Sequence, residues 1–95
     1  MKTSETLYAA ARYIRKHGWR VGTDENNGPR PCCMLDAAYR VINETGENGY
    51  LYAFKALYLV TEINPADFND FHCKTAYDAI AALEIAADIA AAEGN

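Results

Sequence analysis

Residues that interrupt helices are few in this chain, and they fall at the ends of segments whose apolar residues recur at helical spacing. The 95 residues include six glycines and three prolines, whereas alanine, the strongest helix former, is abundant. Apolar residues make up 51% of the chain and charged residues 23%, a composition typical of folded globular domains. We therefore predict an all-α fold: a single domain over residues 1–95, built as a compact bundle of about four helices.

The first two helices are predicted from their apolar spacing and from the glycines that follow them. One covers about residues 4–17 and ends at Gly18, and the next covers about residues 32–44 and ends at Gly46. The connection between them, residues 19–31, is dense in turn-forming residues. Because apolar and polar residues alternate at its start, a short hairpin is compatible with this connection.

The third predicted helix, about residues 49–63, is apolar nearly all round. Such a helix must be covered on most sides, and three neighbouring helices cover it only in part. The last helix adds apolar residues that lie away from its main apolar stripe. We therefore predict an interface for self-association or for a partner protein, because aromatic side chains anchor such surfaces well. Its candidate residues are Tyr50, Tyr52, Tyr58, Ile85 and Ile89, and the alternative is a wider core that buries them.

A polar pair flanked by aromatic residues precedes the last helix, in a segment (residues 68–74) that is predicted to be a loop. Fixed donors and acceptors beside aromatic rings are typical of a recognition pocket. The alternative is a structural role, in which the short polar side chains bind nearby backbone and fix the turn. The candidate binding residues are Trp19, Phe68, Asn69, Asp70 and Phe71.

The last helix is predicted to begin after Thr75, with Asp78 completing a capping box at its start. Its four acidic residues are accompanied by no basic residue: Asp78, Glu84, Asp88 and Glu93. An acidic helix suits a basic partner, but more often such residues form a solvated face. We expect these acids to be exposed and to influence which partners bind.

Cys32 and Cys33 stand side by side where the second helix is expected to begin. A thiol in the first turn of a helix can be a nucleophile, and its candidate partners here are His17, His72 and Asp70. We favour the alternative, in which Cys33 is a small buried packing residue and Cys32 is the more exposed thiol. Zinc is not predicted, because adjacent ligands do not match the spacing of structural zinc sites. No catalytic residue and no cofactor is predicted.

Charge is unevenly divided along the chain. Residues 1–40 carry seven basic and four acidic residues, and residues 41–95 carry two basic and nine acidic residues. The acidic half would oppose a phosphate backbone, so nucleic-acid binding is not predicted. Lys55 and Glu62 interrupt the best apolar run, and no apolar signal segment follows the amino terminus, so neither a membrane span nor export is predicted. We therefore expect a cytoplasmic protein with reduced cysteines.

Four short patterns occur in order along the chain: a helix ending in Gly18-Trp19, with Gly22 soon after; Cys33-Met34-Leu35-Asp36-Ala37; Phe68-Asn69-Asp70; and Thr75-x-x-Asp78-x-Ile80. Together they resemble a family of small proteins of unknown function found in actinobacteria and their phages. That family typically has Cys-x-Leu-Gly-Ala at the second helix, where this chain has Asp36, and Trp-Asn-Asp before the last helix, where this chain has Phe68. The resemblance implies a compact helical domain of actinobacterial or phage origin, located in the host cytoplasm if phage-encoded. It implies no activity.

These observations favour a small non-enzymatic interaction protein, linked to phages by the resemblance, that binds a host or phage protein and can form a homodimer. The alternative is a small-ligand binder or a thiol enzyme built around Cys33, Trp19 and the Phe68–Asp70 segment. The sequence contains no phosphate-binding loop, dinucleotide fingerprint or metalloprotease motif, so no substrate class is predicted.

Overall fold

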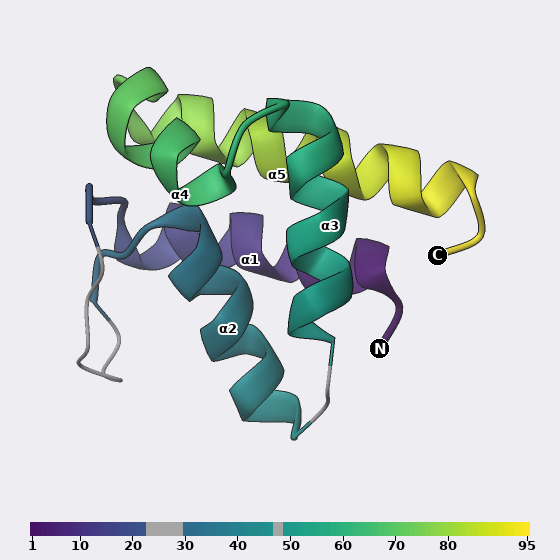
Figure 1. Ribbon diagram of the computed structural model, residues 1–95. Helices are drawn as coiled ribbons and strands as arrows, with labels where there is room; N and C mark the ends of the chain where they lie inside the picture. Colours follow the sequence, from purple (N-terminus) through teal and green to yellow (C-terminus); the bar gives the residue numbers. More distant parts are fainter. Residues whose placement is uncertain (23–29, 47–48) are drawn as a thin grey trace.

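The computed structural model describes residues 1–22, 30–46 and 49–95, and these residues form helices and no strand. The all-α fold predicted from the sequence is confirmed. The elements are α1 (Thr3–His17), α2 (Met34–Thr45), α3 (Tyr50–Thr61), α4 (Pro65–Asp67), the π-helical turn η1 (Phe68–His72) and α5 (Ala76–Ala92). Helices α1 and α5 lie side by side, and the α2–α3 pair crosses them at a steep angle (Figure 1).

The pair of α1 and α5 is the centre of the fold. The apolar stripe of α1 includes Leu7 and Ile14, both almost completely buried. The buried side of α5 consists mainly of alanines, and such small side chains let the two backbones approach closely. The two helices run in opposite directions (Figure 1). Leu7 and Ile14 belong to a single core cluster that also includes residues of α2, α3 and α5.

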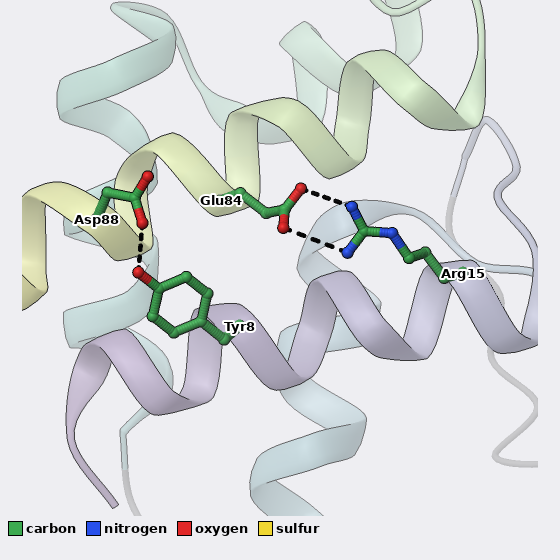
Figure 2. Close-up of polar contacts among 4 residues, drawn as sticks. All are labelled: Tyr8, Arg15, Glu84 and Asp88. Carbon is green, nitrogen blue, oxygen red and sulfur yellow. Dashed lines mark hydrogen bonds and ion pairs between the residues drawn. The ribbon is translucent and has the colours of Figure 1, made fainter.

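Two polar contacts join the outer sides of α1 and α5 (Figure 2). The Tyr8 hydroxyl donates a hydrogen bond to the Asp88 carboxylate. The Arg15 guanidinium donates two hydrogen bonds to Glu84, with N···O distances of 2.7 and 3.2 Å. Both side chains of this ion pair remain partly exposed, so it contributes little to stability and mainly fixes the register of the two helices.

The prediction that the acids of α5 are exposed holds for Asp88 and Glu93, whereas Asp78 and Glu84 are partly buried. Glu84 and Asp88 bind α1, and Asp78 accepts hydrogen bonds from the backbone N–H groups of Lys74 and Thr75. These last contacts complete the predicted capping box at the start of α5, which is confirmed. The acids of α5 therefore serve mostly to fix this helix in place.

The ends of α1 and α2 follow the predicted glycines. Gly18 ends α1 with a φ of 99°, and Gly46 ends α2 with a φ of 72°, both in backbone conformations that side-chain-bearing residues rarely adopt. Helix α2 begins at Met34, two residues later than predicted, because Cys33 is extended and forms its N-cap. Helix α3 is shorter than predicted by one residue at its start and two at its end.

The described residues of the connection between the first two helices do not form the hairpin with which its sequence is compatible. Trp19 and Cys32 form a single bridge, and its strands run parallel rather than antiparallel. The bridge has two backbone hydrogen bonds, from Arg20 N to Cys32 O at 3.2 Å and from Cys32 N to Gly18 O at 3.3 Å. Residues 23–29 of the connection lie outside the described residues.

The segment predicted as a loop before the last helix is helical in its first part. Pro65 begins α4 at a first-turn position, where its missing N–H costs nothing, and the Asn64 side chain caps this turn by accepting from Ala66 N. The chain continues without interruption into the π-helical turn η1. Such turns are rare and often occur at functional or strained positions. In this protein the π-helical turn carries the polar pair Asn69-Asp70.

Candidate functional site

The amide of Asn69 is the most highly connected side chain of the predicted binding segment. Its Oδ1 accepts from Trp19 Nε1 at 2.7 Å and from the backbone N–H of Met34 at 3.1 Å. Its Nδ2 donates to Arg20 O at 3.2 Å and to Asp70 Oδ1 at 2.9 Å. A side-chain amide can make four hydrogen bonds, and this completely buried amide makes all four.

These bonds tie three distant parts of the chain together. Asn69 links η1 to the start of α2 and to the segment that follows α1, and Asp70 Oδ1 extends the link by accepting from Gly22 N at 2.8 Å. The amide of Asn69 is therefore directed into the protein, and the partly buried Asp70 directs its Oδ1 toward Asn69 and the backbone of Gly22. The arrangement positions segments of the fold and leaves no amide donor or acceptor of Asn69 for a ligand.

The aromatic residues of the same segment lie apart from this network. Phe68 packs against the core, stacks on His72 with ring centroids 6.0 Å apart, and lines a surface hollow of about 470 Å³ together with Ile85. Phe71 projects away from the protein and is 78% exposed. The five candidate binding residues therefore do not surround one pocket: Trp19, Asn69 and Asp70 form the internal network, and the two phenylalanines lie outside it.

All three cysteines are free and buried, so the prediction that Cys32 is an exposed thiol is wrong. The parallel bridge to Trp19 holds the backbone of Cys32 against the end of α1, and its side chain joins the core. Cys33 does not act as a first-turn residue of α2; its sulfur caps the helix and accepts from Asp36 N at 3.4 Å. Burial, partly offset by this bond, raises the pKa of the Cys33 thiol to about 11. Burial and nearby acids also raise the pKa of Cys73 to about 11.

We expect the native thiols to react slowly with a disulfide reagent such as DTNB at pH 8, because so little thiolate is present and access is blocked. Unfolding in guanidinium should expose three rapidly reacting thiols per chain, so the two reaction time courses check this expectation. A cysteine that reacts in the native protein as fast as in the unfolded protein would contradict this expectation.

The raised pKa values of Cys33 and Cys73 also predict a dependence of stability on pH. Because the folded state favours the neutral thiols, the free energy of unfolding should fall as the pH rises from about 9 toward 11.

Large apolar side chains are exposed on the outer sides of α3 and α5. Leu59, Tyr52 and Leu51 are 76%, 64% and 59% exposed, and the other members of the set remain about half exposed. Only Ala53, Leu57 and Thr61 of α3 are buried. We call the exposed set the α3–α5 face, and its residues are Leu51, Tyr52, Tyr58, Leu59, Ile85 and Ile89.

Four residues of the α3–α5 face line two hollows that share Leu59. Tyr52, Leu59 and Ile89 line one groove between α3 and α5, and Tyr58 and Leu59 line a second hollow on α3. Of the predicted interface residues, Tyr50 alone lies aside: it packs edge-on against Tyr39 of α2 at a centroid distance of 5.9 Å. Leu51 and Leu59 were not among the predicted residues, although the apolar character of the third helix on all its sides was the signal for them.

A family model matches residues 1–89 and is described as a family of unknown function, DUF6197. The chain belongs to the DUF6197 family. No curated protein and no solved structure matches it. The matched range, residues 1–89, includes the Asn69 network and the α3–α5 face up to Ile89.

Two further features are absent from residues 1–22, 30–46 and 49–95. There, no helix is both long and apolar enough to cross a membrane. The same residues contain no group of three or more histidine, cysteine or acidic side chains placed to hold a metal ion.

Proposed function

We propose that this DUF6197 protein is a small, non-enzymatic interaction protein that binds another protein through the α3–α5 face. The observation that carries the proposal is the exposure of six large apolar side chains on two adjacent helices. Single exposed apolar residues are normal on protein surfaces, whereas contiguous patches mark binding sites. The two tyrosines and the leucines are side chains that anchor protein interfaces by filling pockets on a partner.

The alternative, a ligand binder or thiol enzyme around Cys33, Trp19 and the Phe68–Asp70 segment, receives less support. A nucleophilic cysteine needs a lowered pKa, and that of Cys33 is raised. A recognition site needs polar groups free to bind, and the amide of Asn69 already has its full set of partners. The resemblance to actinobacterial and phage proteins extends the proposal to a phage-linked role in which the partner is a host or phage protein.

A pull-down with matched variants tests this proposal. The immobilised protein should capture one stoichiometric partner from an actinobacterial lysate, and Leu59→Glu should reduce the capture at least about tenfold by placing a charge in the centre of the contact. The control is Tyr77→Glu, because Tyr77 is as exposed as Leu59 (75% and 76%) but lies outside the α3–α5 face. The proposal of a host or phage partner is wrong if no lysate protein is captured, or if both variants capture the same protein as the unaltered chain does.

A further inference from the structure

We propose that the α3 part of the α3–α5 face binds a second copy of the same chain, with the two α3 helices antiparallel about a two-fold axis that passes between Tyr58 and Leu59. This inference rests on the proposed function and names one partner for it. In a two-fold dimer the same surface is used by both copies, so the surface must be complementary to itself. The outer side of α3 meets that requirement.

The exposed stripe of α3 has the spacing of a helix-packing surface. Leu51, Lys55 and Tyr58 are separated by four and three residues, so they follow one side of the helix, and Glu62 continues the spacing at the C-cap. All four residues are exposed. Tyr58 and Leu59 lie at the middle of this stripe, between the two charges.

The two charges of the stripe make it complementary to itself in one direction only. Lys55 and Glu62 are seven residues apart, a separation of about two helical turns or roughly 10 Å. In an antiparallel pair centred between residues 58 and 59, Lys55 of each copy lies opposite Glu62 of the other, which gives two ion pairs. A parallel pair would instead place lysine against lysine and glutamate against glutamate. Charge complementarity therefore selects the antiparallel dimer.

Apolar contacts follow the same symmetry. Across the proposed axis Tyr58 lies opposite Leu59, and these side chains are 46% and 76% exposed in the single chain. Phe54, Lys55, Tyr58 and Leu59 already line one surface hollow on α3, so the apolar contacts and one charge of the proposed interface are adjacent in a single chain. A second copy would cover this hollow with the same four side chains.

Glu62 is the C-cap of α3, and its backbone is left-handed. It is the one non-glycine residue with positive φ (64°) among the described residues. Glycine adopts this conformation at a helix end without strain, whereas in other residues the Cβ atom makes it unfavourable. Neither Glu62 nor Lys55 has an ion-pair partner in the described part of the chain. A carboxylate at a strained position, with no ion-pair partner among residues 1–22, 30–46 and 49–95, is consistent with a partner in a second copy.

Sedimentation velocity over a range of protein concentrations up to about 1 mM tests the dimer. We expect a concentration-dependent dimer whose Kd rises at least about tenfold in Lys55→Glu and in Glu62→Lys, because each reversal creates like charges twice at the interface. The double reversal Lys55→Glu/Glu62→Lys should restore the Kd to within about threefold, since the complementary pairs form again with their signs exchanged. The control reversal Arg12→Glu, at an exposed position of α1, should change the Kd by less than about twofold.

Three results would overturn the second-copy proposal: a monomer at every concentration, a dimer unaffected by the single reversals, or a double reversal that fails to restore association. The pull-down with Leu59→Glu separates this outcome from failure of the proposed function. A strict monomer that still captures a lysate protein in a Leu59-dependent manner overturns the dimer and supports the wider proposal. A third outcome is that no lysate protein is captured and the charge-exchanged dimer does form. The second copy is then the partner, and the proposal of a separate host or phage partner is wrong.

Discussion

Replacing Asn69 with alanine is expected to lower the free energy of unfolding by about 3 kcal/mol, because buried donors and acceptors lose their partners. The backbone N–H of Met34, the carbonyl of Arg20 and the indole N–H of Trp19 all bind this one amide. An unsatisfied buried polar group costs about 1–3 kcal/mol, and water that enters the vacated space recovers part of the loss.

Chemical denaturation followed by circular dichroism measures this loss, and Asn64→Ala is its matched control. Asn64 is exposed and makes a single cap bond to Ala66 N, so its removal should cost about 1 kcal/mol or less. Trp19, the one tryptophan of the chain, supplies an independent readout, because its emission should shift to longer wavelength when water replaces the Asn69 oxygen. Equal losses of stability in the two variants would show that the Asn69 network does not hold the fold together.

The regular helices of this protein were predictable because their signals are local. Gly18 and Gly46 end helices by backbone conformation, and Thr75 with Asp78 caps a helix within four residues of sequence. Such features act through neighbours in the chain, so a sequence pattern is sufficient to find them. The boundary errors are one to two residues; at the start of α2, Cys33 is extended rather than helical, and at the end of α3, Glu62 is left-handed.

The role of Asn69 was not predictable in the same way, because its partners lie about 35 to 50 residues away. The sequence alone left a ligand-binding amide and a structural amide open as alternatives. The same limit applies to Cys32, whose burial depends on a bridge to Trp19 across the connection between α1 and α2. These assignments are determined by tertiary contacts rather than by local preference.

The exposed surface of α3 could be predicted from the sequence only in part. The sequence predicts that the third helix has more apolar surface than its neighbours cover, and the interface hypothesis follows from that surplus. It does not predict which side of the helix is left exposed, because apolar residues occur all round. The structure supplies that choice by burying Leu57 and exposing Leu59 two positions later.

Leu57 and Leu59 therefore allow a second test with a large expected effect. The same substitution, leucine to alanine, is made separately at each of these two positions of α3. Leu57→Ala should lower the free energy of unfolding by about 2–5 kcal/mol, because it opens a cavity at a completely buried position. Leu59→Ala should lower it by less than about 0.5 kcal/mol, because the side chain is already mostly in water.

The order of the two effects should reverse when association is measured. Leu59→Ala removes side-chain contacts from the centre of the α3–α5 face and should raise the Kd of the dimer about tenfold while the chain remains folded. Leu57→Ala, studied at a temperature where it is still folded, should leave the Kd nearly unchanged, because Leu57 does not reach the surface. Denaturation and sedimentation on the same two variants thus separate a residue that stabilises the fold from one that binds. A stability loss at Leu59 comparable to that at Leu57 would mean that the outer side of α3 packs within the chain and is not an interface.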